Sequence, residues 1–329
     1  MDLRVTSGNG PNTWAALRKS EKSSLWQRIG LFHFVTMTLG TLFRRITADG
    51  SIFGAKKSPN IVRAVLRDAN RLPNGTFQFK AQLSKGTPFI VQASSDLETW
   101  SPVLNGVASG DITSYADGHA SKFNCRFYRL LAGEAPGSNI IGYVSVSLPP
   151  GFSMIANPLE GPTNTLGKVF KDWPDGTTLN KFDTQLFRLA ENSVRFSHWS
   201  NPSEKLNPGE GAIFFNPTSD YRSACFTGEV LAKNLSVSIS SGFSMRSSPL
   251  PQSGSLVEDL EFPIANGDVI HLFDREKQQY ELHPYENGHW TAGAPVVGVG
   301  ESFWVAKTEP GDWTRTLGAV AELEPHSNN

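Results

Sequence analysis

The chain has 329 residues with a formal net charge of −1 at pH 7, and 19% of its residues are charged. A chain of this length has room for two or three domains, and its balanced charge excludes nucleic-acid binding driven by a broad basic field. The two cysteines, Cys125 and Cys225, have no second thiol nearby, which excludes a disulfide-rich scaffold and a cysteine zinc site. An aromatic share of 11%, with 30 Gly and 21 Pro, favours a turn-rich β protein.

Residues 1–58 form a polar, basic leader with one apolar run, Ile29–Phe43. Basic residues flank this run on both sides. Its 15 residues are too few to cross a membrane comfortably, but they suit the core of an export signal. We expect an export or targeting segment here, and the alternative is a disordered or loosely docked leader. Membrane contact is expected only through this segment, if it stays uncleaved.

Short strands are predicted between residues 60 and 132. Thr76–Leu83 alternates apolar and polar residues with period two, Phe89–Ala93 is a compact apolar run, and Arg126–Leu131 is typical of a closing strand. Between the second and third of these segments, a tight turn at Ser94–Trp100 is expected to return Leu97 and Trp100 to the core. This spacing predicts a small antiparallel sandwich of immunoglobulin or fibronectin type.

The rest of the chain contains one pattern twice. Gly151-Phe152-Ser153-Met154 returns as Gly242-Phe243-Ser244-Met245, and the shift of 91 residues persists without a gap to later matching positions. A period of this size indicates tandem structural units, so we predict two homologous β-rich repeats. The connection between them is short and carries no Pro or Gly, which predicts that they pack together as one unit.

Each repeat is expected to open with an alternating strand and to contain one short helix, at Leu166–Phe170 and at Leu256–Leu260. An Asp-Gly or Asn-Gly dipeptide then favours a tight turn before a hairpin, whose first strands are predicted at Thr178–Asp183 and Val269–Asp274. The last strand of each repeat is expected to be buried together with its aromatic residues, which are Phe214, Phe215, Phe303 and Trp304.

The predicted fold is therefore mainly β, with a small immunoglobulin- or fibronectin-like sandwich followed by two tandem homologous β-rich repeats, each with one short helix. The predicted boundaries are a leader at 1–58, the sandwich at 60–132, a linker at 132–138, repeats at 138–231 and 232–318, and a polar tail at 319–329. Cys125 and Cys225 fall in different predicted units, so a disulfide between them is not expected.

Two sets of strings carry a family resemblance. In the repeats they are GFSMIANPL, PDGTTLNKFD and SHWSNPSEKLNPGEGAIFFNP with their second copy, and in the sandwich they are FIVQASSDLETW and CRFYRLL. They resemble the duplicated modules, and the small β module before them, of uncharacterised exported proteins from verrucomicrobial and planctomycete-type bacteria. The resemblance covers about residues 60–317. It implies export and a β-rich surface or secreted protein, and it implies no particular activity.

The sequence contains no recognisable set of catalytic residues. Ser153 and Ser244 lack the second glycine of a nucleophile elbow. Six carboxylates would serve glycoside cleavage only if the fold brought two together, and four of them recur between the copies, which favours a structural role; the six are Asp172, Asp175, Asp183, Glu210, Asp274 and Glu301. Asp172–Gly176 lacks the ligand ladder and the terminal glutamate of a calcium loop, so a calcium site there is only the alternative. Phosphate and dinucleotide motifs are absent from the sequence, and neither a metal nor a cofactor is expected.

The candidate ligand-binding residues are His198-Trp199 and His289-Trp290, which occupy matching positions in the two repeats. An indole beside an imidazole can stack on a sugar ring and bind its polar groups. The sequence favours the alternative, in which each Trp fills a small β core and its neighbouring His lies at the rim, because aromatic residues dominate core burial.

We therefore expect a non-catalytic, exported structural or ligand-binding β-repeat protein, secreted or at the bacterial cell surface. Its expected partner is a polysaccharide or a surface protein, and not a nucleic acid. The alternative is a glycoside or peptide hydrolase whose carboxylates converge only in three dimensions. The two differ in geometry, because a glycosidase needs two carboxylates roughly 5 to 9.5 Å apart, whereas a binding protein needs an aromatic patch or groove.

Overall fold

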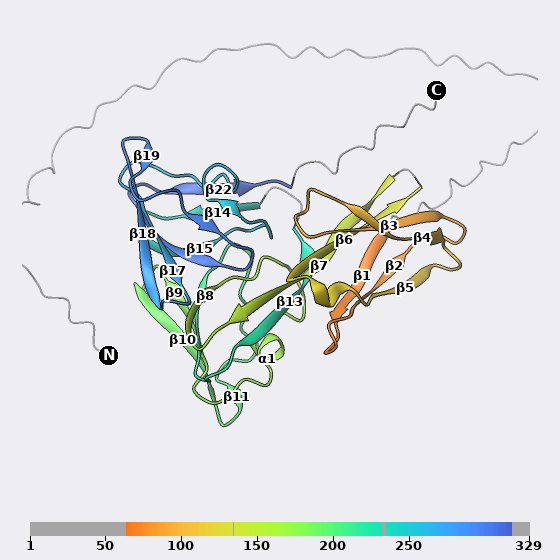
Figure 1. Cartoon of the computed structure of the whole chain (residues 1–329), viewed down its shortest axis with the longest axis horizontal. Coiled ribbons are helices and arrows are strands. Elements are labelled where there is room, and N and C mark those ends of the chain that lie inside the picture. The colour runs from red at the N-terminus through yellow and green to blue at the C-terminus, as the bar shows by residue number, and fades with distance from the viewer. Residues whose placement is uncertain (1–63, 134, 232–234, 318–329) are drawn as a thin grey trace, which may run out of the picture. The chain divides into compact units, whose positions relative to one another are not determined.

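The computed structural model describes residues 64–133, 135–231 and 235–317. The expected export segment with Ile29–Phe43 and the expected polar tail at 319–329 lie outside the described residues. Within the described residues the chain is mainly β, with several sheets and almost no helix, as the sequence predicts (Figure 1).

The N-terminal part is a sandwich of two antiparallel sheets. Its strands are β1 (Val65–Arg71), β2 (Phe77–Gln82), β3 (Pro88–Ser94), β4 (Ser101–Val107), β5 (Ile112–Asp117), β6 (Cys125–Ala132) and β7 (Ala135–Leu148), with a 3-10 turn at Ala120–Lys122 before β6. One sheet has the order β1-β2-β5, and the other contains β4-β3-β6-β7. Seven strands divided in this way suit the predicted immunoglobulin- or fibronectin-type sandwich. Between the sheets, the ring of Phe77 stacks on that of Tyr128 at 5.0 Å.

Strand β7 belongs to the sandwich and also to the chain that follows. It pairs with β6 on one side and with β13 (Arg222–Val230) on the other, giving a five-stranded sheet in the order β13-β7-β6-β3-β4 (Figure 1). The linker expected at 132–138 is therefore wrong, because most of this segment is the first part of β7. Cys125 and Cys225 lie on opposite sides of β7, in β6 and β13, and both are free thiols.

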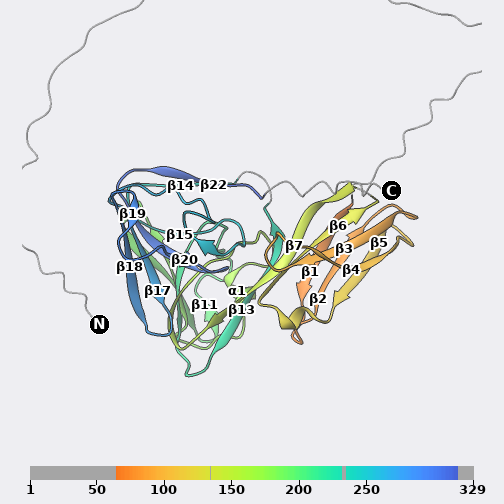
Figure 2. The same ribbon diagram turned by 45° about the horizontal axis from the view of Figure 1, so that its top comes forward.

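Two more antiparallel sheets of five strands follow (Figures 1 and 2). The first sheet consists, in order, of β8 (Gly151–Ile155), β12 (Ala212–Asn216), β9 (Thr178–Asp183), β10 (Arg188–Arg195) and β11 (His198–Trp199). The second sheet consists, in order, of β15 (Gly242–Ser247), β21 (Ser302–Lys307), β17 (Val269–Asp274), β18 (Gln279–Glu286) and β19 (His289–Trp290). The strand orders match, and β9, β10 and β11 begin and end 91 residues before β17, β18 and β19.

The single α-helix of the described residues, α1 (Leu166–Val169), lies where the first short helix is predicted. The second predicted helix, at Leu256–Leu260, is wrong, because this segment forms hydrogen-bonded turns. Just before it, β16 (Gly254–Ser255) pairs with β20 (Val296–Val297), and just after it Glu261 has a positive φ of 53°. A helix this short has little stability of its own, so the flanking ladder decides the conformation.

Each five-stranded sheet covers its own core. Phe170 and Phe214 stack at 4.7 Å under the first sheet, and Leu97 reaches this core from the β3–β4 turn of the sandwich. Under the second sheet, Phe303 packs with Trp313 of β22 (Gly311–Arg315), a strand that pairs with β14 (Leu235–Ile239).

The two sheets contact each other through matching pairs of residues. The Ala156 N–H donates to the Gly300 carbonyl at 2.9 Å, and the Ser247 N–H donates to the Gly209 carbonyl at 3.2 Å. Both donors, and both acceptors, are 91 residues apart. The edge strands β8 and β15 therefore meet the opposite sheet in the same way, as in a two-fold interface within one chain.

Candidate functional site

Strand β11 positions the first predicted His-Trp pair. Trp199 is only 7% exposed, and its indole N–H donates to the Phe170 carbonyl at 3.1 Å. The neighbouring His198 is exposed, with its Nδ1 at 2.6 Å from the Phe196 carbonyl oxygen. Trp199 thus fits the core alternative, with His198 at the rim.

Strand β19 positions the second pair. Trp290 is half-buried against the core of the second sheet, with its ring 5.0 Å from that of Tyr285, and His289 is exposed. Since β11 and β19 are the strands farthest from the contacting edges of their sheets, the structure does not bring the two pairs together in one site.

A cavity of about 560 Å³ lies beside β11. Its walls include Trp173, His198 and Trp199, together with the polar side chains of Lys171 and Asp172. The guanidinium of Arg222 covers the Trp173 ring at 4.7 Å from its centroid. This is the place where two of the predicted site residues line a common space.

A second, more apolar hollow lies where the two sheets meet. It is a groove of about 310 Å³ lined only by aromatic side chains. We call it the aromatic groove, and its residues are Phe182, Phe187, Phe243, His271, Tyr280 and Trp304. Four adjacent strands of the second sheet, β15, β21, β17 and β18, contribute one residue each, and the β9–β10 hairpin of the first sheet contributes the other two.

The rings of the aromatic groove hold one another in place. Phe182 meets Trp304 edge-on at 4.9 Å and Phe187 edge-on at 5.3 Å. The indole N–H of Trp304 donates to the Tyr280 hydroxyl at 3.3 Å. Phe187, Phe243 and Tyr280 remain 67%, 43% and 42% exposed. The groove is therefore an ordered aromatic surface that is open to solvent.

The prediction that both terminal aromatic residues of each repeat are buried is half wrong. Phe214 and Phe303 are fully buried, whereas Phe215 and Trp304 are half-buried on the other face. Successive side chains of a strand point to opposite faces, so two adjacent aromatic residues cannot both face the core. This alternation was the signal in the sequence that could have revealed Trp304.

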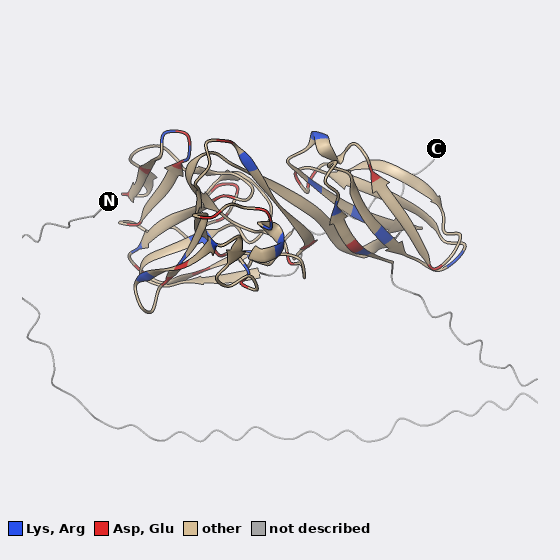
Figure 3. Cartoon of the chain, turned by 90° about the horizontal axis from the view of Figure 1, so that it is seen from below, with Lys and Arg blue, Asp and Glu red and all other residues tan. Residues whose placement is uncertain are grey.

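The aromatic groove contains no side chain that is charged at neutral pH. Partial burial lowers the pKa of His271 below its ordinary value, so the imidazole is neutral. Burial also raises the pKa of Tyr280, although the hydrogen bond with Trp304 opposes this shift. Across the described residues, basic and acidic residues are interspersed along the chain (Figure 3). A ligand of the groove would therefore be recognised by shape and hydrogen bonding.

The matching positions of the first sheet do not repeat the aromatic groove. A shift of 91 residues relates His271, Tyr280 and Trp304 to Asn180, Leu189 and Ile213. The shared sheet arrangement forms with these residues as well, so the fold does not require aromatic side chains at the three positions. Their presence in the second sheet alone needs another explanation.

The six carboxylates considered for hydrolysis mostly support local structure. Asp183 accepts the N–H groups of Gln185 and Leu186, and Asp274 accepts those of Glu276 and Lys277 in the same turn of the second sheet. Asp175 accepts two N–H groups of the β10–β11 turn, and Glu301 pairs with Arg275. Asp172 is exposed and lines the cavity beside β11.

Glu210 is ionised at neutral pH. Burial alone would raise its pKa, but hydrogen bonds from the Asn207 N–H and the Lys181 ammonium hold the pKa below its ordinary value. A general acid at neutral pH needs a raised pKa, so this environment does not suit that role. The serines of the repeated Gly-Phe-Ser-Met motif, Ser153 and Ser244, are fully buried.

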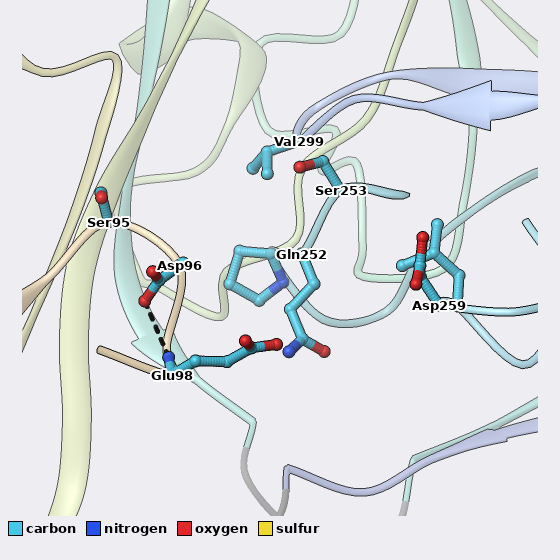
Figure 4. A pocket seen from close by; sticks show the side chains of 9 residues that line it. Ser95, Asp96, Glu98, Gln252, Ser253, Asp259 and Val299 are labelled. Atoms are coloured by element: carbon cyan, nitrogen blue, oxygen red, sulfur yellow. Dashed lines mark hydrogen bonds between the residues drawn. The ribbon is translucent and has the colours of Figure 1, made fainter. Parts of the chain in front are cut away.

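A third hollow, of about 320 Å³, lies between the β3–β4 turn and the segment after β15 (Figure 4). Asp96, Glu98 and Asp259 line it. Asp96 accepts the N–H of Glu98 at 2.8 Å, and Asp259 accepts that of Ser255 at 2.8 Å. Two of its three carboxylates therefore hold turns, which leaves the aromatic groove as the better candidate site.

No group of three or more His, Cys, Asp or Glu side chains in 64–133, 135–231 and 235–317 is arranged to hold a metal ion. None of the helices in the described part is long and apolar enough to span a bilayer. Comparisons of the chain with known protein families, with characterised proteins and with solved structures found no match. We therefore infer the function from the geometry of the site.

Proposed function

We propose that the chain is a non-catalytic, exported β protein that binds a polysaccharide through the aromatic groove. The observation that carries this proposal is an open groove lined only by aromatic side chains, placed across the junction of two sheets. Sugar rings present apolar C–H faces that stack on aromatic rings, and their hydroxyl groups bind polar atoms at the rim.

The asymmetry between the two sheets supports a binding role. Phe214 is a buried core residue of the first sheet, and the matching residue of the second sheet, Val305, is also buried and apolar. The groove residues Tyr280 and Trp304 have no aromatic counterpart in the first sheet. Exposed aromatic side chains that the fold does not need are typical of recognition surfaces.

The alternative is a hydrolase acting on glycosides or peptides. The cavity beside β11 would be its place, with Asp172 on the wall. The hydrogen bonds of Asp175, Asp183 and Asp274 to turns favour the non-catalytic proposal, because these oxygens already have structural partners.

Secretion or attachment at the bacterial cell surface is part of the proposal. It depends on the basic flanks of Ile29–Phe43 and on the resemblance to exported proteins. The test expresses two forms of the protein in a bacterial host, the full chain and a form without residues 1–58. The readout is the cell fraction that contains each form. Retention of both forms in the cytoplasm would contradict export.

The binding proposal is tested on a glycan array combined with turnover assays on each glycan that binds. We expect binding without release of shorter products. Trp304→Ala should lower the affinity about tenfold or more, since a well-packed aromatic anchor contributes on this scale. Hydrolysis that a single carboxylate substitution abolishes would overturn the proposal in favour of the alternative.

The matched control is Phe215→Ala. Phe215 is also a half-buried aromatic residue of a central strand, but it packs against Phe152 at 4.8 Å and does not line the groove. It should leave the affinity unchanged. Equal losses in Phe215→Ala and Trp304→Ala would show that the groove is not the binding site.

A further inference from the structure

A side-chain amide occupies backbone hydrogen-bonding groups on β8, the edge strand of the first sheet. Gln278 accepts the Phe152 N–H at 2.7 Å and donates to the Phe152 carbonyl at 2.9 Å. In an antiparallel pair, residues alternate between pointing both backbone groups at the partner strand and pointing both away. Phe152 therefore points its N–H and its C=O outward from β8, and one amide group binds both.

Phe243 occupies the same place on β15. Phe152 lies opposite Phe215 in its ladder, and Phe243 lies opposite Ala306, the residue 91 positions after Phe215. Four residues further along β15, the Ser247 N–H reaches the opposite sheet. Ser247 therefore points its backbone groups away from β21. Because this direction alternates from residue to residue, Phe243 also points its N–H and C=O outward.

The residue that matches Gln278 is Phe187, whose side chain has no hydrogen-bonding group. A Cβ added to Gly151 would lie 2.5 Å from the Gln278 amide oxygen, whereas a Cβ added to Gly242 would meet nothing within 4 Å. Within the described ranges, Phe243 makes no side-chain hydrogen bond like that of Phe152. The edge of β15 is therefore open beside Phe243, at the wall of the aromatic groove.

The open edge is short. Further along β15, the Met245 carbonyl accepts the Arg246 guanidinium at 3.0 Å, and the Ser247 N–H is bound to Gly209. A peptide that adds a strand needs several successive backbone pairs. One outward N–H and C=O suit a single small group with an acceptor and a donor.

We propose that the aromatic groove takes an N-acetylated saccharide, whose acetamido oxygen accepts the Phe243 N–H while the sugar ring lies against Trp304. A hydroxyl or the amide N–H of the sugar donates to the Phe243 carbonyl. This inference rests on the proposed function, since it names the chemical class of saccharide for the same groove. The lack of charged side chains in the groove agrees with a neutral ligand.

The test compares two hexasaccharides with the same β-1,4 linkage, one of N-acetylglucosamine and one of glucose, by calorimetry on the full chain. We expect about tenfold tighter binding of the acetylated form, the scale of one well-placed hydrogen bond pair. Equal affinities would overturn this inference and leave the proposed function standing. Binding of neither sugar would overturn this inference, and the glycan array then decides on the proposed function. A hexapeptide of alternating valine and threonine is titrated as well, and binding of this peptide alone would overturn both.

A substitution that should occupy the Phe243 edge tests the inference directly. Phe187→Gln recreates the residue that closes the first sheet, so its amide should occupy the Phe243 backbone groups. Phe187→Leu removes the same ring without supplying an amide. We expect the preference for the acetylated sugar to disappear in Phe187→Gln and to persist in Phe187→Leu. Persistence in both variants would contradict the inference.

Discussion

The pair formed by Lys307 and Asp268 shows how one residue pair can stabilise a strand end. Both side chains are almost completely buried, and their ion pair joins the end of β21 to the residue before β17. Asp268 also accepts hydrogen bonds from Thr308 and from the Ala265 N–H. A buried pair of this kind is costly to break, because the remaining charge stays without its partner.

Lys307→Met should therefore lower the free energy of unfolding by about 3 to 5 kcal/mol. Urea titration followed by circular dichroism measures this change. The control is Lys277→Met, which removes an exposed lysine paired with Asp274 and Glu281 and should have little effect. Similar losses in the two variants would contradict the assigned role of the buried pair.

The same pair predicts a pH dependence. Burial alone would raise the pKa of Asp268, but the hydrogen bonds from Lys307 and Thr308 hold it below its ordinary value. A carboxyl with a depressed pKa stabilises the fold above its unfolded-state pKa, and this contribution is lost as pH falls through the folded-state pKa. The stability of the native chain should thus fall more steeply below about pH 4 than that of the double variant Asp268→Asn/Lys307→Met. Parallel curves would contradict this.

At the scale of single elements, β7 couples the sandwich to the rest of the chain. It has a paired strand on each side, so its backbone approaches both neighbours closely. A Cβ on Gly142 of β7 would lie 2.5 Å from the Arg126 carbonyl oxygen and 2.7 Å from the Phe127 ring. Glycine at this position thus allows β6 and β7 to pair.

Gly142→Ala should destabilise the fold by about 1 to 3 kcal/mol, the usual cost of overpacking. Thermal unfolding measures the loss, and Gly118→Ala is the control, because a Cβ there would meet nothing within 4 Å. An unchanged melting temperature in Gly142→Ala would show that β6 and β7 do not pack as closely as the structure describes.

The elements that the sequence predicts best are those with a clear local pattern. β9 and β17 have the bounds that alternation and the preceding Asp-Gly and Asn-Gly turns predict, Thr178–Asp183 and Val269–Asp274. The segment Leu256–Leu260 has helical spacing, but the neighbouring β16–β20 ladder overrides it. The shared role of β7 depends on pairing between distant strands, which no local pattern reveals.

The candidate site was less predictable than the fold. Trp199 was a candidate ligand-binding residue because a tryptophan recurs at the matching position, and it is a buried core residue. The aromatic groove combines residues of two sheets, and Trp304 and Tyr280 have no aromatic partner at the matching position. Repetition therefore identified scaffold residues, whereas the proposed binding residues lie where the two copies differ.

At the scale of the whole described chain, the contact between the two sheets creates the groove. Ala156 and Ser247 form matching hydrogen bonds across this contact, which bring Phe182 of the first sheet to Trp304 of the second. A groove assembled in this way depends on both sheets, so we expect binding to require residues 138–318 together.

Hydrogen–deuterium exchange with and without a saturating polysaccharide ligand tests the location of the binding site most directly. The account predicts slower exchange at residues 242–245, 270–272 and 303–305, where β15, β17 and β21 line the aromatic groove. Exchange at 170–174 and 197–202, around the cavity with His198 and Trp199, should not change. Protection confined to those two segments would place the ligand beside β11 and contradict the account.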